Sequence, residues 1–341
     1  MPRCGSQCIL CDLPIRFDNY KGCTHGCRYC FTQRNNKELN KVGAFEGKKA
    51  LLNFINGQRN RETSWCDWNI PIHWGGLSDP LQPIESKLGS TFECLKIFQK
   101  SQYPFVISTK GKLLGDEKYI SLLEKCNAVV QISLVCDKYD KIEKGAPPFY
   151  ERLKIIEKIS PRVKRVIVRI QPYMCEVFDD VFKNLFSFKN AGAYGVIVEG
   201  MKFQKRKQGL IKVGGDFAYP YERLKADFEK LKDEAHRLGL KFYSGENRLR
   251  SMGDSLTCCG IDGLKGFMPN TYNLNHIIND KNKVISSKAQ QTKGTGSCFK
   301  ALKQTSVYNK FFGEASFEEA MKWYFSNSQD FINSIFGINN R

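Results

Sequence analysis

The chain has 341 residues, with 53 Lys and Arg against 35 Asp and Glu and a formal net charge of +18 at pH 7. Its 14 cysteines are too few for a disulfide scaffold, and no run approaches the roughly 20 apolar residues that span a membrane. We therefore expect a cytoplasmic protein with no membrane partner, large enough for a barrel of about 200–250 residues and an appendage.

A cysteine-rich loop near the N-terminus, over residues 21–31, is the most informative segment. Cys23, Cys27 and Cys30 are spaced by four and three residues. Three thiolates so spaced can bind three irons of one 4Fe–4S cluster and leave the fourth iron open to a small molecule. A structural zinc site needs a fourth ligand, and His25 inside the loop is badly placed to supply it. Unrelated core cysteines are the other alternative, although the glycines and polar residues around them indicate a loop.

Apolar β-rich runs alternate with helical patterns from this loop to about residue 243. We expect strands over residues 14–20, 70–74, 105–109, 129–134, 163–171, 195–199 and 241–243. We expect helices over residues 48–55 and 85–100 and from about residues 117, 149, 177 and 221. This alternation predicts an α/β fold with a parallel sheet, closed or partly closed as a TIM-like barrel. Its chemistry would lie at the carboxyl ends of the strands, where the cysteine loop follows the first strand.

Three segments follow from this pattern. Residues 1–12 form a cysteine-rich N-terminal extension, residues 13–245 a partial (β/α)6 barrel, and residues 246–341 a C-terminal extension with a final amphipathic helix over about 317–336. Basic residues cluster over 202–207 and 281–310. Because surplus positive charge attracts phosphate groups, we expect a nucleic-acid or nucleotide partner; a solvated lysine-rich surface is the alternative.

The cysteine spacing, with aromatic Tyr29 before the last cysteine, closely resembles the motif of the radical SAM superfamily. Residues 73–85, His-Trp-Gly-Gly-Leu-Ser-Asp-Pro-Leu-Gln-Pro-Ile-Glu, resemble the Ser/Thr-Asp-Pro-x-Gln-Pro-x-Glu pattern of its spore-photoproduct-lyase-like branch, often labelled DNA-repair-photolyase-like. Residues 108–111 resemble that branch's Thr-Lys element, and residues 142–153 its Glu-Pro-Gly-Ala-Pro…Arg-Leu element. A weaker likeness is to radical SAM proteins of bacterial mobile elements.

The resemblance implies an enzyme that holds a 4Fe–4S cluster and reductively cleaves S-adenosylmethionine to a 5′-deoxyadenosyl radical, which abstracts hydrogen from a substrate. A reductant such as flavodoxin or ferredoxin is implied, and a partner protein is left open. The cofactor-binding candidates on the matched elements are Tyr29, Gly75, Gly76, Ser78, Lys110 and Arg152. Lys110 and Arg152 would neutralise the methionyl carboxylate, and the two glycines would let backbone approach the ligand.

Two departures from the family pattern bear on the reaction. Leu77 stands where a Gly-Gly-Glu-like element has its glutamate, and Gly76 aligns with the hydrogen-donor cysteine of spore photoproduct lyase. Glycine has no thiol that could donate a hydrogen atom. We therefore expect another reaction on a similar scaffold, and the substrate is not predicted.

A second cysteine group repeats the first spacing. Cys4, Cys8 and Cys11 lie before the first barrel strand, and Cys258 and Cys259 follow the last one. The triplet predicts a second metal site, with one residue of the Cys258–Cys259 pair as the fourth ligand and Cys298 as the alternative source. The metal is either zinc or an auxiliary iron–sulfur cluster, because both accept four thiolates. The alternative is a reduced tail whose cysteines bind nothing.

Three functions remain open from the sequence. The first is a radical enzyme acting on nucleic acid or a nucleotide, which the charge and the branch resemblance favour. The second is a radical SAM enzyme that modifies a peptide or protein, in which extra cysteines serve an auxiliary site. The third is a non-catalytic nucleic-acid-binding protein stapled by metal.

Overall fold

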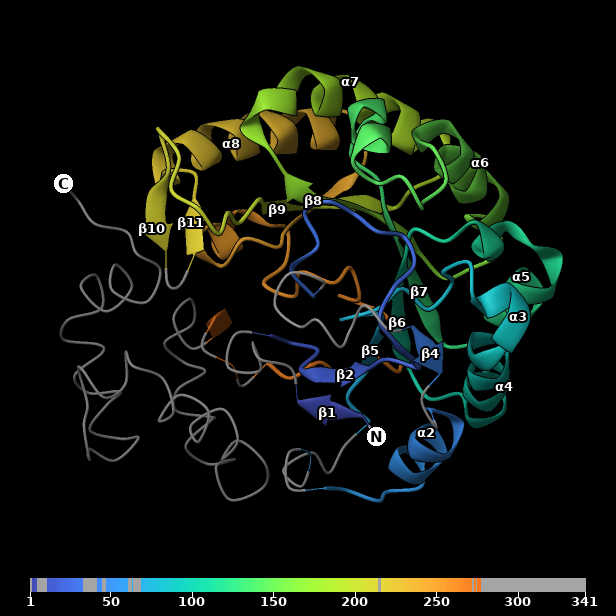
Figure 1. Cartoon of the computed structure of the whole chain (residues 1–341). Helices are drawn as coiled ribbons and strands as arrows, with labels where there is room; N and C mark the ends of the chain where they lie inside the picture. The colour runs from blue at the N-terminus through green and yellow to red at the C-terminus, as the bar shows by residue number, and fades with distance from the viewer. Residues whose placement is uncertain are drawn as a thin grey trace, which may run out of the picture.

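The computed structural model describes residues 2–4, 11–32, 42–44, 47–60, 63, 69–213, 216–271, 273 and 275–276. Its centre is an eight-stranded sheet in the order β1-β2-β5-β6-β7-β8-β9-β12 (Figure 1). The strands are β1 (Arg3–Cys4), β2 (Ile15–Phe17), β5 (Ile72–Trp74), β6 (Phe105–Thr109), β7 (Ala128–Ser133), β8 (Val166–Tyr173), β9 (Gly195–Gly200) and β12 (Lys241–Ser244). Neighbours from β2 to β12 pair in parallel, whereas β1 pairs antiparallel with β2. The predicted α/β fold with a partial TIM-like barrel is confirmed.

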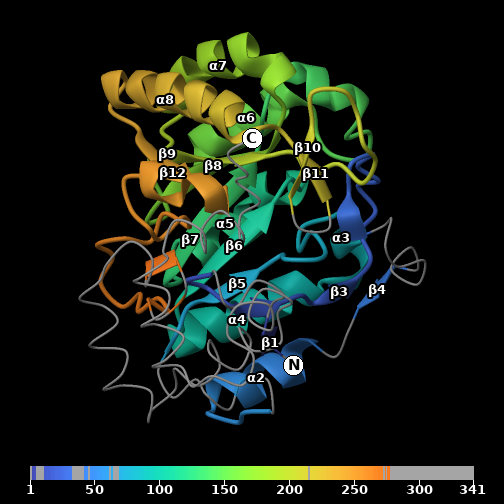
Figure 2. The same ribbon diagram turned by 90° about the vertical axis from the view of Figure 1, so that its left-hand side faces the viewer.

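Helices cover the outer face of the sheet as an arc (Figures 1 and 2). They are α2 (Gly47–Ile55), α3 (Glu85–Leu88), α4 (Ser90–Ser101), α5 (Glu117–Leu123), α6 (Phe149–Ile159), α7 (Phe178–Asn190) and α8 (Tyr221–Arg237). Short 3₁₀ turns are η3 (Lys112–Gly115), η4 (Asp137–Lys141), η5 (Cys175–Val177) and η6 (Asn247–Met252). Two small antiparallel pairs complete the description: β3 (Tyr20–Lys21) with β4 (Gly43–Ala44), and β10 (Ile211–Val213) with β11 (Asp216–Ala218).

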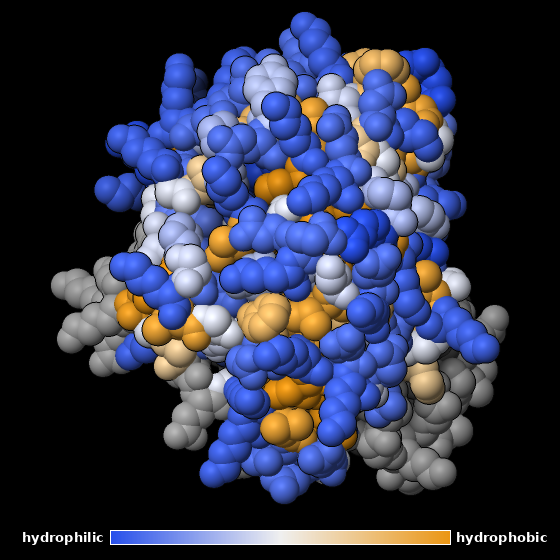
Figure 3. Space-filling view, turned by 90° about the vertical axis from the view of Figure 1, so that its right-hand side faces the viewer, coloured by the Kyte–Doolittle hydropathy of each residue, from blue (hydrophilic) through white to orange (hydrophobic). Residues whose placement is uncertain are grey.

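The central strands are apolar because both faces of the sheet are covered. All five residues of β6 are buried, as expected for a parallel sheet under helices. Phe105 turns outward, where its ring stacks on Phe98 of α4 with centroids 4.0 Å apart. Val106 turns inward to a second apolar cluster inside the barrel. The face in Figure 3 is mainly hydrophilic, with apolar side chains in small groups, as expected of the solvent side of amphipathic helices.

The sequence prediction differs most from the structure in three elements. The helix expected over 85–100 is two helices, because Gly89 takes a left-handed conformation with φ of 62° and interrupts it. The first strand ends at Phe17 rather than continuing to residue 20, because Asn19 turns to accept a hydrogen bond from Trp74 Nε1 at 2.8 Å. β8 begins three residues later than expected, at Val166, and runs on to Tyr173.

The two ends of the described chain meet on the concave side of the sheet (Figure 1). Asp12 joins them: its Oδ1 accepts from Asn273 Nδ2 at 2.7 Å, its Oδ2 lies 2.9 Å from His276 Nε2, and Thr257 Oγ1 also donates to it. The N-terminal segment is therefore part of the barrel wall through β1 and fastened to the segment after β12. The expected helix over 317–336 lies outside the described residues. No helix in the described ranges is both long and apolar enough to cross a membrane.

Candidate cofactor site

The cysteine loop lies at the carboxyl end of β2, on the edge of the sheet where a parallel barrel carries its chemistry. Cys23, Cys27 and Cys30 are all partly buried and none is in a disulfide. The backbone N–H of Cys30 donates to the carbonyl of Cys27 at 3.0 Å, and the N–H of Arg28 donates to the carbonyl of Ile142 at 2.9 Å. The loop is therefore folded on itself and joined to the segment after β7.

These three thiols suit a cluster better than a single ion. Burial raises the pKa of Cys23 to about 12 and that of Cys27 to about 11, so the thiolates need a bound cation to be stable. Within the described part of the chain, no three Cys, His, Asp or Glu side chains are arranged to hold one metal ion. In an iron–sulfur cube each cysteine binds a different iron, so its ligands need not converge on one point. Three thiols on one loop fit that donor set.

Polar side chains of the segment after β5, residues 78–85, form hydrogen bonds with the cysteine loop and with the strand that leads into it. Ser78 Oγ donates to the carbonyl of Tyr20 at 2.9 Å. Gln82, which is fully buried, donates from Nε2 to the carbonyl of Gly22 at 3.0 Å and accepts from the N–H of Thr24 at 2.8 Å. Ser78 was expected to bind cofactor; the structure shows it buried and bonded to the strand that leads into the loop.

Asp79 is the second anchor of the loop. Its carboxylate lies 3.2 Å from His25 Nε2 and accepts from Thr109 Oγ1 and the N–H of Lys110, both at 2.6 Å. Burial alone would raise the pKa of Asp79, but the charge of His25 and these hydrogen bonds outweigh it and lower the pKa. The other ring nitrogen of His25 lies 2.8 Å from the carbonyl of Gly145. Both ring nitrogens of His25 therefore face partners within the protein.

Glu85 ends the same segment and fastens it to the helices. Its carboxylate accepts from Tyr119 Oη at 2.7 Å, from the N–H of Thr91 at 2.8 Å and also from Tyr20 Oη, and only 1% of it is exposed. The loop therefore rests on a scaffold that reaches through to α4 and α5.

Glu143 joins three of the predicted cofactor residues. Arg152 Nη1 lies 2.7 Å from Glu143 Oε2, Lys110 Nζ lies 3.9 Å from Oε1, and Tyr29 Oη donates to Oε1. Arg152 is 1% exposed and its Nη1 also donates to the carbonyl of Ser133 at 2.8 Å. Arg152 is therefore committed to Glu143, which argues against its predicted contact with a methionyl carboxylate. Lys110, 15% exposed and 5.7 Å from the centre of the Tyr29 ring, remains suited to that contact.

The two adjacent glycines after β5 have different surroundings. Gly75 has φ of 93°, and an added Cβ would lie 2.4 Å from the carbonyl oxygen of Ser108. Gly76 has room: the nearest atom to an added Cβ would be Arg16 Cδ at 3.4 Å. The backbone conformation therefore requires glycine at position 75. Position 76 has space for a side chain, and its glycine leaves the backbone there partly exposed.

The barrel interior beside these glycines carries cationic side chains. Arg169 Nη1 donates to Ser108 Oγ at 2.9 Å and lies 3.4 Å from His73 Nε2, while Arg16 contacts the other ring nitrogen of His73. The Nε of Arg169 is buried with no hydrogen-bond partner. Glu199 is the nearby carboxylate, and burial raises its pKa. A raised pKa favours the neutral carboxylic acid, which compensates the charge of Arg16 and Arg169 less than a carboxylate would.

Part of the second cysteine group is brought together inside the barrel. Cys11 and Cys259 belong to one buried cluster, and Cys258 packs against it. The sulfurs of Cys258 and Cys259 are 3.8 Å apart. Cys4 lies in β1, and Cys8 is outside the described residues.

Guanidinium groups accompany these sulfurs. Arg16 Nη2 donates to Cys11 Sγ at 3.4 Å. A hydrogen bond from Cys259 and the charge of Arg250 lower the pKa of Cys258 to about 5. Of the predicted second group, Cys11, Cys258 and Cys259 thus share one buried region, and their role as metal ligands stays a prediction.

The sequence reasoning missed the residues that hold the loop: His25, Asp79, Gln82, Glu85 and Glu143. A signal for four of them was present. Asp79, Gln82 and Glu85 match letters of the quoted Ser/Thr-Asp-Pro-x-Gln-Pro-x-Glu pattern, and Glu143 matches the first letter of the Glu-Pro-Gly-Ala-Pro element. His25 carried no such signal.

No protein-family model matches the chain. Uncharacterised proteins of Mycobacterium tuberculosis and Mycobacterium bovis are 25% identical over 214 residues, which covers 58% of this chain and 62% of each relative. The chain thus spans less than two thirds of the length of these curated relatives.

Solved structures of spore photoproduct lyase share the fold. The enzyme complexed with dinucleoside spore photoproduct has a TM-score of 0.54 at 15% identity, covering 68% of this chain and 77% of that one. A mutant with bound AdoMet and the same dinucleoside also has a TM-score of 0.54, at 14% identity over 68% of this chain and 76% of that one. The predicted resemblance to the spore-photoproduct-lyase-like radical SAM branch is confirmed at the level of the fold.

Proposed function

We propose that this chain is a radical SAM enzyme that holds a 4Fe–4S cluster through Cys23, Cys27 and Cys30. One observation carries the proposal: a loop with three thiols lies at the carboxyl edge of a partial barrel and is clamped there by the two elements after β5 and β7. An anchored loop is what a cluster needs, because its ligands must keep their positions as the iron changes charge.

Different residues around the cysteine loop would bind different parts of S-adenosylmethionine. When bound, the cluster and S-adenosylmethionine would supply a 5′-deoxyadenosyl radical. Lys110 offers a partly exposed ammonium for the methionyl carboxylate, and Gly75 and Gly76 offer backbone groups with no side chain in the way. Tyr29, tied to Glu143, fixes the last turn of the loop.

We propose nucleic acid or a nucleotide as the substrate. The net charge of +18 and the cations Arg16 and Arg169 in the barrel interior favour an anionic ligand. The structural neighbour that carries dinucleoside spore photoproduct adds support. Gly76, which has no thiol, argues for a reaction other than repair of that lesion. The electron would come from a reductant such as flavodoxin or ferredoxin.

The experiment is anaerobic reconstitution of the full chain, with iron and acid-labile sulfide measured. We expect about four irons and four sulfides for each loop. Incubation with dithionite, S-adenosylmethionine and either a single-stranded oligonucleotide or a peptide library then separates the nucleic-acid proposal from the peptide alternative. Protein that takes up zinc but no sulfide would instead favour the non-catalytic, metal-stapled alternative.

A second metal site is a separate proposal, supported by the approach of Cys11 to Cys258 and Cys259. Metal is counted in a variant with Cys23, Cys27 and Cys30 all changed to Ala. Residual zinc or iron that is lost on adding Cys258→Ala supports the site; a folded, metal-free triple variant removes it.

A further inference from the structure

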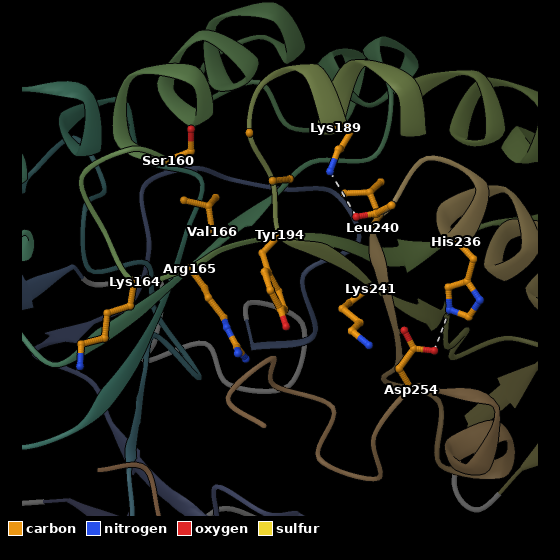
Figure 4. Close-up of a pocket in the computed structure, with 13 residues that line it drawn as sticks. Ser160, Lys164, Arg165, Val166, Lys189, Tyr194, His236, Leu240, Lys241 and Asp254 are labelled. Atoms are coloured by element: carbon orange, nitrogen blue, oxygen red, sulfur yellow. Dashed lines mark hydrogen bonds and ion pairs between the residues drawn. The ribbon is translucent and has the colours of Figure 1, made fainter. Parts of the chain in front are cut away.

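A pocket of about 750 Å³ opens at the end of the barrel opposite the cysteine loop (Figure 4). It lies where β8, β9 and β12 begin, and the last turns of α7 and α8 flank it. Catalytic groups of a parallel barrel sit at the carboxyl ends of its strands. This pocket is therefore separate from the proposed cofactor site.

Four cationic side chains line the pocket, and they come from different elements. Lys164 and Arg165 precede β8, Lys241 begins β12, and Lys189 lies in the last turn of α7. Figure 4 shows Lys164, Arg165 and Lys241 extending to the same side of the sheet edge, with Tyr194 between Arg165 and Lys241. Adjacent strands are about 4.8 Å apart, so the cations form a row along that edge.

Three of these cations donate hydrogen bonds to neutral oxygens. Lys164 Nζ donates to Asn127 Oδ1 at 2.7 Å, and Lys189 Nζ donates to the carbonyl of Gly239 at 3.2 Å. Arg165 Nη1 donates to the carbonyls of Gly260 at 3.0 Å and Asp262 at 2.7 Å. Hydrogen bonds to neutral oxygens orient the cations but do not neutralise their charge.

Carboxylates are few and already engaged in this part of the described structure. Asp254 is the acidic residue in the lining, and it accepts from the N–H of Phe242 at 3.0 Å and lies 2.7 Å from His236 Nε2. Asp262 Oδ1 lies 3.8 Å from Arg165 Nη1, a distance that gives a weak ion pair. The pocket therefore keeps a positive excess that an anion would neutralise.

Tyr194 adds an aromatic surface to the row. The Arg165 guanidinium lies 4.1 Å from the centre of its ring, so both side chains are held in place by their stacking. Cations interleaved with an aromatic ring are the arrangement that binds nucleotide phosphates and bases. The volume is also in the range of about 300–1,000 Å³ that holds small organic ligands.

We infer that this pocket binds the phosphate groups of a nucleotide ligand, with Lys164 and Arg165 on one side and Lys241 on the other. The phosphates could belong to a free nucleoside triphosphate or to single-stranded nucleic acid. The inference does not depend on the proposed radical chemistry, because the pocket lies at the amino ends of β8, β9 and β12 and the cysteine loop follows the carboxyl end of β2.

The test compares two charge-matched variants of the full chain. Lys164→Gln/Lys241→Gln removes two charges from the pocket, and Lys87→Gln/Lys100→Gln removes two exposed charges from α3 and α4. Fluorescence anisotropy measures binding of a labelled 20-nucleotide single strand and of a fluorescent ATP analogue at several salt concentrations. Cleavage of S-adenosylmethionine is measured in parallel and should equal the wild type in both variants.

We expect the pocket variant to lose at least tenfold in affinity for one of the two probes, while the control variant changes less than twofold. Loss with the single strand should also lower the salt slope by about 0.7 for each phosphate contact removed. Loss with the ATP analogue alone identifies a free nucleotide as the source. Equal affinity in the two variants, or no binding of either probe by the wild type at low salt, overturns the inference.

Discussion

The Nε2 atom of His25 lies 3.2 Å from the Oδ2 atom of Asp79, and both side chains are less than a tenth exposed. The contact joins the cysteine loop to the segment after β5 across 54 positions of the sequence. The Asp79 carboxylate also lies close enough to Cys23 to help raise the pKa of that thiol, so a shift of the loop would separate these groups.

Replacing Asp79 with Asn should loosen the loop. The amide keeps the shape but loses the charge that faces His25, and breaking a buried pair costs about 3–5 kcal/mol. We expect lower free energy of unfolding in urea and a reduced iron content after reconstitution. Glu93→Gln, at an exposed pair on α4, is the control and should change both by little. Full iron retention in Asp79→Asn would show that the pair does not position the loop.

The two glycines give a matched pair of variants. Gly75→Ala should destabilise the fold by roughly 1–3 kcal/mol, because its φ of 93° and the carbonyl of Ser108 leave no place for a methyl group. Gly76→Ala should stay within about 0.5 kcal/mol. Urea denaturation followed by circular dichroism measures both. Similar stabilities would contradict the strain assigned to Gly75.

Replacing Lys110 should lower the affinity for S-adenosylmethionine, whereas replacing Arg152 should lower the stability of the fold. Lys110→Ala should weaken the apparent affinity for S-adenosylmethionine with iron content constant. Arg152→Ala leaves Glu143, 2% exposed, without its closest cation, so we expect a loss of about 3–5 kcal/mol in unfolding free energy first. A stable Arg152→Ala protein with weakened cofactor binding would restore the role that the sequence predicted for this residue.

Glu199 should make stability depend on pH. Burial raises its pKa above the ordinary value of 4.5, so the folded chain binds this proton more tightly than the unfolded chain. The contribution of Glu199 to stability is therefore greatest below pH 4.5 and falls as the pH rises through the folded-state pKa. Glu199→Gln should flatten this part of the profile. A profile identical to the wild type would mean that Glu199 is solvated in the folded chain.

Much of this architecture could be predicted from the sequence because it is local. The alternation of apolar runs gave the parallel sheet, and the spacing of Cys23, Cys27 and Cys30 placed a thiol loop after the first strand. The contacts that anchor the cysteine loop are hydrogen bonds between residues far apart in the sequence, and they form only in the folded chain. Gln82 reaches Gly22 only once the chain is folded, and Asp12 meets His276 from the far end of the described chain. Spacing carries no information about such contacts.

The measurement that tests the central claim most directly is the yield of 5′-deoxyadenosine from S-adenosylmethionine under dithionite. Wild-type protein and Cys126→Ala, which alters a buried cysteine remote from the loop, should both form it. Cys27→Ala should form none, because two thiolates cannot hold the cluster. Wild-type yield from Cys27→Ala, or no product from reconstituted wild-type protein, would contradict the assignment of this chain as a radical SAM enzyme.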